Sequence, residues 1–341
     1  MCGRHCGLPQ NDWGNAVSSL RRVVDSLLLV VVLSLAPVGA WAQDYPNRAI
    51  TIIVPFTPGA TTDTVARLTR DVLERELGAP VVIDNRGGAG GTIGATAVAN
   101  AKPDGYTLLI SVNAPITMNP HAQKSFPFDA VAAFEPISLA GESMLILAVN
   151  PSLPVKTVPE LIDYAKQNPG KISYGSAGVG SAHHVAGEMM KQKTGIDMAH
   201  VAYRGGPLAI QDLISGNIQV SFGTPPAVLP HAQAGAIRII ALAEAKRHPD
   251  HPGVPTIDET LAGVVTNTWV VFFAPAGTPQ PIIDKLNKAM RVALAQPDAI
   301  EKFKLQGLTA VSSSPEELRK TVKEEYERWG RIIPNINMQA K

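Results

Sequence analysis

The chain is 341 residues long and carries 30 basic and 29 acidic side chains, so its formal net charge is +1 at pH 7. This balance excludes the strongly basic surface that binds nucleic acid or an anionic membrane by electrostatics. The length is sufficient for two domains that each bury a hydrophobic core.

The first 42 residues have the pattern of a secretory signal peptide. Arg21 and Arg22 precede the apolar run SLLLVVVLSLAPVGA (residues 26–40), and the tripeptide AWA (residues 40–42) is a small-x-small processing site. The apolar run is shorter than the roughly 20 residues that a transmembrane helix requires. We therefore expect cleavage after Ala42 and export of the mature chain, with no membrane anchor.

Both cysteines, Cys2 and Cys6, lie in the segment that we expect to be removed. The mature chain, residues 43–341, is then free of disulfides, thiol nucleophiles and CxxC metal sites. It retains 27 basic and 27 acidic residues, and its formal net charge is zero. Composition therefore indicates a neutral, exported globular protein that depends on packing for its stability.

From Ile50 onward, short apolar runs alternate with amphipathic segments, which predicts an α/β fold with mostly parallel sheets and flanking helices. We expect strands at residues 50–55, 81–84, 106–111, 144–149, 171–175, 218–222, 237–242 and 269–274. We expect helices at residues 62–77, 91–101, 281–294 and 315–329, and one capped by Thr157.

Four loops that follow predicted strands are rich in small and polar residues. They are PFTPGATTD (55–63), NRGGAGGTIG (85–94), YGSAGVGSAHH (174–184) and AYRGGP (202–207). Each leads into a segment that can start a helix, where free backbone N–H groups and the positive end of the helix dipole attract anions. Ligands of α/β proteins bind at such loops, so the pattern predicts an anion-binding site.

The second of these loops is similar to a dinucleotide-binding turn but does not match it. Gly88, Gly90 and Gly94 are spaced G-x-G-x-x-x-G, one residue longer than the Rossmann fingerprint, and they follow the second predicted strand, not the first. No acidic residue stands at the end of a clear next strand. We therefore interpret this loop as a structural turn and helix start that is able to touch a ligand.

A nucleophilic site is not indicated either. Ser176 and Ser181 lie near His183 and His184, but neither serine fits the pattern G-x-S-x-G. Adjacent helical residues face different directions, so one histidine can line a site while the other packs.

The sequence gives equally little indication of a metal site. His248 and His251 form an H-x-x-H pattern in a proline-rich loop without a third ligand, so we interpret them as part of a solvated loop. Asp63 is the one acid in a ligand-type loop. It either complements the helix dipole or contacts a ligand through water or a hydroxyl group.

A set of longer stretches extends over nearly the whole mature chain in a fixed order. They include YPNRAITIIVPFTPGATTDTVAR, PVVIDNRGGAGGTIGA, KPDGYTLL, VNPSLPVKTVPELI, SYGSAGVGSAHHVAGE, HVAYRGG, DLISGNIQVSFG, PHAQAGAIR and APAGTP. This ordered set resembles the substrate-binding receptors of tripartite tricarboxylate transporters, the Bug receptor family.

The resemblance implies a two-domain, type II-like periplasmic-binding-protein clamshell. Residues 43–143 plus 270–341 would form domain 1, and residues 144–269 would form domain 2. A monomeric receptor of this kind captures a small carboxylate between its domains in the periplasm and delivers it to membrane permease subunits, without a cofactor and without catalysis.

The resemblance also implies which residues bind the ligand. In domain 1 they are Phe56, Thr57, Gly59, Ala60, Asp63 and Asn113. In domain 2 they are Ser176, Ala177, Gly178, Ser181, Ala182, Tyr203, Arg204 and Gly205.

One departure from the family pattern concerns the ligand. Where the family has an acidic residue after the strand that ends at Phe222, this chain has Gly223 and then Thr224. An ammonium group would lack its natural counter-charge there. We therefore expect a plain carboxylate or a bulkier aromatic acid in contact with this region, and not an amino acid.

Two alternatives remain open. A receptor that reports its ligand to a membrane kinase would have the same clamshell. A periplasmic hydrolase would need a nucleophile–base pair, which the sequence does not show.

Overall fold

The computed structural model describes residues 45–336 together with Gly3 and Met338. The predicted signal peptide, residues 1–42, lies outside the described residues apart from Gly3. The chain divides into a unit of residues 1–45 and a unit of residues 46–341, and the second unit contains all the helices and strands described here. No helix among the described residues combines the length and the apolar character needed to cross a membrane.

The first sheet has six strands in the order β11-β4-β10-β3-β1-β2. Its strands are β1 (Ile50–Val54), β2 (Val81–Asn85), β3 (Thr107–Val112), β4 (Phe134–Ser143), β10 (Thr268–Pro275) and β11 (Leu308–Thr309). β1 runs parallel to β2 and β3, and it places Ile52 opposite Ile83 and Leu108. This sheet carries the N-terminal and C-terminal parts of the unit.

The second sheet has five strands in the order β7-β6-β8-β5-β9. Its strands are β5 (Ile146–Val149), β6 (Ile172–Ser176), β7 (Met198–Ala202), β8 (Val220–Gly223) and β9 (Arg238–Leu242). β6 runs parallel to β7 and β8. Every residue of β5 is completely buried, so β5 is an interior strand, as its uninterrupted apolar sequence predicts.

Most strands of each sheet run in one direction, as predicted, but both sheets also contain antiparallel strands. β10 is antiparallel to both β3 and β4, and β5 is antiparallel to both β8 and β9. β5 and β10 are the strands by which the chain enters one sheet from the other. A helical crossover within one sheet makes the strands that it joins parallel. Among the described residues no such crossover leads into β5 or β10, so these two strands can run antiparallel to their neighbours.

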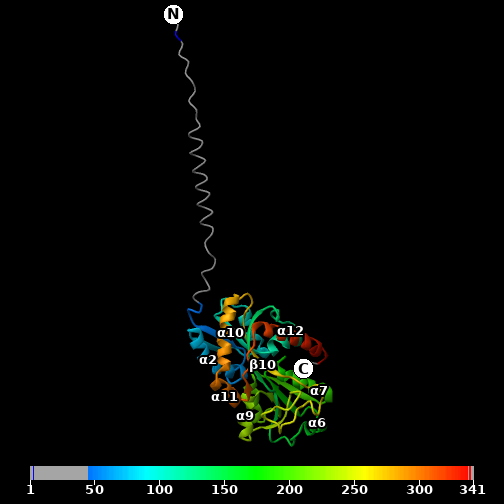
Figure 1. The fold of residues 1–341 in the computed structure, drawn as a ribbon. Helices are drawn as coiled ribbons and strands as arrows, with labels where there is room; N and C mark the ends of the chain where they lie inside the picture. The colour runs from blue at the N-terminus through cyan, green and yellow to red at the C-terminus, as the bar shows by residue number, and fades with distance from the viewer. Residues whose placement is uncertain (1–2, 4–44, 337, 339–341) are drawn as a thin grey trace. The chain divides into compact units, whose positions relative to one another are not determined.

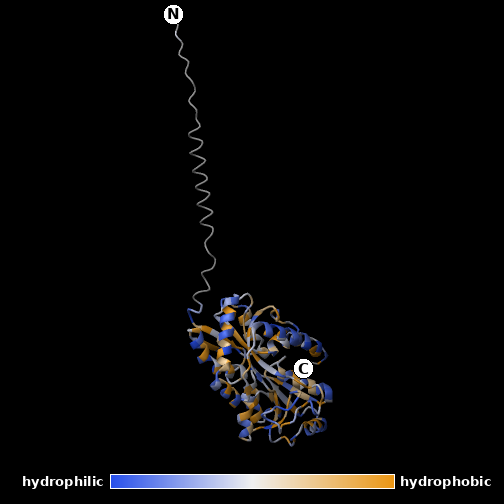
Figure 2. Cartoon of the chain, viewed as in Figure 1, coloured by the Kyte–Doolittle hydropathy of each residue, from blue (hydrophilic) through white to orange (hydrophobic). Residues whose placement is uncertain are grey.

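Helices flank both sheets. They are α2 (Thr61–Leu77), α3 (Thr92–Ala99), α4 (Ala114–Thr117), α5 (Asn119–Ala122), α6 (Val158–Gln167), α7 (Ala182–Thr194), α8 (Gly206–Ile214), α9 (Pro225–Gln233), α10 (Gln280–Ala295), α11 (Pro297–Leu305) and α12 (Pro315–Ile332), with short 3-10 turns at Ala89–Gly91 and Ile333–Asn335. α2 and α10 pack against each other on the first sheet (Figure 1). Hydrophobic residues concentrate in the strands, while the helices also carry hydrophilic residues (Figure 2).

Two helix ends follow the signals that the sequence contains. α2 buries Val65, Leu73 and Leu77 on one face and ends at Gly78, which has a φ of 71°. Glycine adopts this left-handed conformation without the steric penalty of a side chain. At the start of α6, the Thr157 hydroxyl accepts a 3.3 Å hydrogen bond from the Glu160 N–H. Both boundaries are confirmed.

The link by which the chain crosses from the first sheet to the second is very short. Two residues, Met144 and Leu145, separate β4 from β5. α12 also connects the two parts, because Leu318 and Val322 lie in the core of the first sheet while Trp329 lies in the core of the second. The two sheets are therefore joined by a short link and by a C-terminal helix whose buried residues pack in both cores.

Candidate functional site

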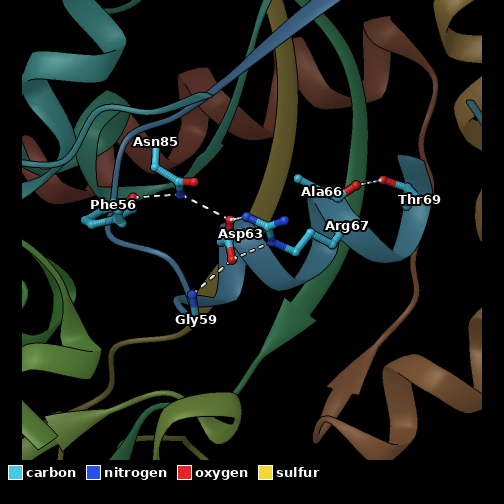
Figure 3. Close-up of polar contacts among 7 residues, drawn as sticks. All are labelled: Phe56, Gly59, Asp63, Ala66, Arg67, Thr69 and Asn85. Atoms are coloured by element: carbon cyan, nitrogen blue, oxygen red, sulfur yellow. Dashed lines mark hydrogen bonds and ion pairs between the residues drawn. The ribbon is translucent and has the colours of Figure 1, made fainter. Parts of the chain in front are cut away.

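The loop between β1 and α2 is organised by the carboxylate of Asp63 (Figure 3). This carboxylate accepts hydrogen bonds from the Gly59 N–H at 2.9 Å, from the Arg67 Nε and Nη2 at 3.0 Å each, and from the Asn85 Nδ2 at 3.1 Å. Asn85 Nδ2 also donates to the Phe56 carbonyl at 3.1 Å. The end of β2 and the first turn of α2 thus hold the loop in one shape.

Asp63 remains ionised in this environment. Burial raises the pKa of its carboxyl, but the hydrogen bonds from Arg67, Gly59 and Asn85 lower it by more, so the pKa lies below its ordinary value. Asp63 is 3% exposed and bonds to four groups of the protein. The structure therefore gives it a scaffolding role at the start of α2, while contact with a ligand through water stays a prediction.

A pocket lies where loops and helix starts from the two sheets meet. The first-sheet part of its lining is Phe56, Ala60, Thr61, Thr62, Val112, Ala114 and Thr268. The second-sheet part is Ala177, Ser181, Ala182, His183, Gly206, Pro207 and Thr224. None of these described residues is Asp, Glu, Lys or Arg. The cavity is about 30 Å³, which is room for about two or three water molecules, so a larger solute enters only if the walls move apart.

Four helices begin at this pocket. They are α2, which starts at Thr61, α7, which starts at Ala182, α8, which starts at Gly206, and α9, whose N-cap is Thr224. The first residues or caps of all four line the cavity. The free N–H groups and dipole ends of several helices therefore face one small space, an arrangement that favours a negative charge without any cationic side chain.

Several buried polar atoms of the lining lack a hydrogen-bond partner among the described residues. They are the hydroxyl oxygens of Thr61, Thr62 and Thr268 and the Nδ1 of His183. These four residues are 1% to 7% exposed. Because a buried polar group without a partner costs free energy, such a group requires an explanation, and a polar ligand in the pocket supplies one.

His183 and His184 are adjacent on α7 but have different surroundings. His183 lines the pocket, and burial lowers its pKa to about 4 although the Phe222 carbonyl favours the protonated ring. His184 Nδ1 accepts a 3.2 Å hydrogen bond from the Gly180 N–H, and its ring stacks on His200 with 3.9 Å between centroids. One histidine lines the site and the other packs, as the sequence indicated for neighbouring helical positions.

The structure contains a serine–histidine pair that the sequence did not reveal. Ser176 Oγ lies 2.6 Å from His200 Nε2 and also accepts a 3.1 Å hydrogen bond from the Gly178 N–H. Ser176 is completely buried and does not line the pocket. This pair orders the loop after β6, and its serine is not accessible to a substrate in the pocket.

The glycine-rich loop at residues 85–94 packs behind the pocket. A Cβ on Gly90 would lie 2.4 Å from the Val179 carbonyl oxygen, and a Cβ on Gly178 would lie 2.6 Å from the Gly90 nitrogen. Gly90 has a φ of 63°. Glycine is therefore required where this loop of the first sheet meets the loop after β6 of the second sheet.

Six of the predicted site residues line the pocket, namely Phe56, Ala60, Ala177, Ser181, Ala182 and Thr224. Thr57, Gly59, Asp63, Ser176, Gly178, Gly205 and Gly223 flank these residues in the loops and strand ends that form the walls. Gly205 approaches Thr57 so closely that a Cβ there would lie 2.4 Å from the Thr57 Oγ1.

The remaining predicted residues face other groups. The Tyr203 hydroxyl donates to Asp212 Oδ2 at 2.6 Å, and Arg204 is exposed. Asn113 Nδ2 donates to the Asn267 carbonyl at 3.1 Å.

Part of the polar lining was not predicted from the sequence. Thr61 and Thr62 belong to the loop at residues 55–63, in which Asp63 was the polar side chain singled out as a ligand contact. Thr268 stands at the start of a strand that looks uniformly apolar. Two threonines in the first turn of a helix next to a glycine-containing loop were the available signal for Thr61 and Thr62.

Comparison with known proteins agrees with this architecture. The family model described as "Tripartite tricarboxylate transporter family receptor" matches residues 65–338. The periplasmic binding protein BugD is 33% identical with a TM-score of 0.81, covering 85% of this chain and 98% of BugD.

Two further solved structures contain small carboxylates. A protein of R. palustris with adipate is 34% identical with a TM-score of 0.81, covering 85% of this chain and 98% of that one. MatC from Rhodopseudomonas palustris with bound malate is 31% identical with a TM-score of 0.81, covering 85% of this chain and all of MatC.

The fold is thus the two-domain α/β clamshell of periplasmic binding proteins, with a sheet in each half and a pocket lined by both. The match covers most of the sequence and nearly the whole length of the similar structures. The chain belongs to the family of tripartite tricarboxylate transporter receptors.

Proposed function

We propose that this protein is a periplasmic solute-binding receptor that captures a small carboxylate in the pocket and delivers it to the membrane permease subunits of a tripartite transporter. The observation that carries the proposal is the meeting of four helix N-termini and several unpartnered buried polar atoms in one uncharged cavity. Carboxylates in two similar structures, adipate and malate, support the ligand class. The signal-peptide pattern of residues 1–42 supports export.

The proposal also includes the boundaries of the two domains and a movement that closes them around the ligand. Domain 1 is residues 43–143 plus 270–341, and domain 2 is residues 144–269. The two-residue link between β4 and β5 and the start of β10 are the proposed hinges. A ligand that touches both sets of helix starts stabilises the closed arrangement by its greater affinity for that state.

The proposed ligand is a carboxylate that is not an amino acid. No acidic residue stands among the described lining residues, so an ammonium group has no counter-charge in the pocket. The surroundings of Gly223 leave little room for a side chain, since a Cβ there would lie 2.6 Å from Val228 Cγ2 and 3.1 Å from Ile210 Cδ1. A plain dicarboxylate or an aromatic acid fits this lining better.

The mature protein, residues 43–341, is the material for the test. Thermal-shift measurements with malate, adipate, nicotinate, aspartate and glutamate are followed by calorimetry on each acid that raises the melting temperature, because a ligand that binds the folded state stabilises it. We expect malate, adipate or nicotinate to bind. Tight binding of aspartate contradicts the stated ligand class, and failure of every acid to bind contradicts the receptor itself.

A further inference from the structure

His183 stands out from the rest of the pocket lining because it is the one titratable side chain among the described lining residues. It is 7% exposed, and its Nδ1 has no hydrogen-bond partner among the described residues. The ring lies against the start of α8, where a Cβ on Gly206 would be 3.2 Å from His183 Cε1. A ligand held at this helix start would therefore meet the imidazole.

No formal charge from the protein opposes or assists a charge on His183. The groups that face the pocket from α2, α4, α9, β3 and β10 are hydroxyls and apolar side chains. Asp63 on α2 is engaged by Arg67 and Asn85, and His184 on α7 stacks on His200. Burial alone keeps the ring neutral, with a pKa lowered to about 4.

We propose that His183 becomes protonated when a carboxylate enters the pocket, so that capture of the ligand is coupled to the uptake of a proton. This inference rests on the proposed function, since it requires an anionic ligand at the same site. The physical reason is that a carboxylate within about 4–6 Å stabilises the charged imidazolium, typically by about 1–3 pKa units. The protonated ring can donate a hydrogen bond from Nδ1 to the ligand, which satisfies the unpartnered atom.

The consequence for affinity follows from linkage. The pKa of His183 is low in the free protein and higher in the complex, so the complex binds more protons than the free protein at any pH between the two values. Affinity therefore rises as the pH falls toward and below the pKa of the complex. We expect a gain of about threefold to tenfold between pH 8 and pH 5.5.

Calorimetry in buffers with different ionisation enthalpies measures the protons taken up for each ligand bound. The probe is the acid, among malate, adipate and nicotinate, that gives the largest thermal shift. We expect net proton uptake at pH 6 that falls to nearly zero at pH 8. His183→Gln removes the uptake and flattens the pH profile, while His248→Gln, a change in a loop outside the pocket, leaves both as in the wild type.

Nuclear magnetic resonance of the histidine Cε1–H group supplies a direct measurement on the unmutated protein. The His183 signal should titrate in the complex at a higher pH than in the free protein. If His183→Gln still takes up protons when the ligand binds, then the ligand itself accepts the proton and the inference is overturned. Binding without uptake in the wild type overturns this inference alone, whereas failure of all probes to bind overturns it together with the proposed function.

Discussion

Asn85 and Asp63 are joined by a 3.1 Å hydrogen bond between the amide at the end of β2 and the carboxylate at the start of α2. The same amide holds the carbonyl of Phe56, whose ring lines the pocket. The first-sheet part of the pocket lining is therefore held in place by residues that do not themselves line the pocket. Substitutions of such scaffolding groups should change stability, whereas substitutions of the unpartnered lining groups should change ligand affinity.

Asp63→Asn should destabilise the protein. The substitution removes the ion pair with Arg67 and weakens the charged hydrogen bonds, each worth about 1.5–3 kcal/mol when one partner is ionised. Because Arg67 is 52% exposed, we expect a loss toward the lower end, about 1–2 kcal/mol, by urea denaturation at pH 7. Asp71→Asn, which affects an exposed pair with Arg70, is the control and should change stability by less than about 0.5 kcal/mol.

The same variant has a defined pH dependence. The pKa of Asp63 is lowered on folding, so its charge stabilises the folded state above the ordinary pKa of 3.8, and this contribution is lost as the pH falls through the lower folded value. The stability difference between wild type and Asp63→Asn should be complete at pH 6 and shrink below pH 4. A difference that is constant from pH 6 to pH 3 would show that the charge is not the cause.

Thr61→Val and Thr62→Val should weaken ligand binding and leave the free protein at least as stable as before, because an unpartnered buried hydroxyl costs free energy. Their hydroxyls are buried without partners, so replacing them by a methyl group removes a group that bonds only to a ligand. Loss of one hydrogen bond to a carboxylate, about 1.5–3 kcal/mol, corresponds to about a 10-fold to 100-fold loss of affinity by calorimetry.

Thr69→Val is the matched control for these two variants. Its hydroxyl is also buried on α2 but already donates to the Val65 carbonyl at 2.9 Å and to the Ala66 carbonyl at 3.3 Å, the second of which is drawn in Figure 3. Thr69 does not line the pocket. Affinity should be unchanged. If all three variants bind equally well, the proposed role of Thr61 and Thr62 is wrong.

Gly90→Ala should impair closure of the two halves. A Cβ there would lie 2.4 Å from the Val179 carbonyl oxygen, and the φ of 63° is strained for alanine. Gly195→Ala provides the comparison, because Gly195 has a φ of 70° with open space around the added atom. Both lose about 1–2 kcal/mol of stability from the left-handed backbone. We expect an additional loss of ligand affinity in Gly90→Ala alone. If Gly90→Ala and Gly195→Ala bind the ligand equally well, the contact between Gly90 and Val179 is not part of closure.

Thr224→Asp should reduce the affinity for a dicarboxylate by at least about tenfold, because the new carboxylate and the ligand carry like charges in one small pocket whose lining holds no Lys or Arg among the described residues. Thr224→Asn has a similar shape without the charge and should bind within about threefold of the wild type. Isothermal calorimetry with malate or adipate compares them. An Asp variant that binds as tightly as the Asn variant would place the ligand elsewhere.

Local signals in the sequence predicted most of the elements and failed where packing decides. The helix that ends at Gly78 and the buried strand β5 follow from periodicity and from glycine chemistry. β4 was not predicted, because Pro136 interrupts it and its residues do not alternate regularly, yet β10 pairs along its whole length. Strand direction depends on how the chain crosses between sheets, and local pattern does not contain that information.

The site shows the same division. The sequence places Ser181 in a loop that leads into a helix and Thr224 just after a strand, and the structure brings both to the pocket. Whether a hydroxyl or an imidazole nitrogen is left without a partner depends on neighbours that are distant along the chain. This is why Thr268 and the role of His183 emerged only from the three-dimensional arrangement.

A structure of the mature protein bound to the acid of the panel with the highest affinity tests the central claim most directly. The account predicts that a carboxylate of the ligand lies between the two sheets, within hydrogen-bond distance of the first-turn N–H groups of α2 or α7 and of the Thr61 or Thr62 hydroxyl. A carboxylate held instead by lysine or arginine side chains, or bound outside this pocket, would contradict it.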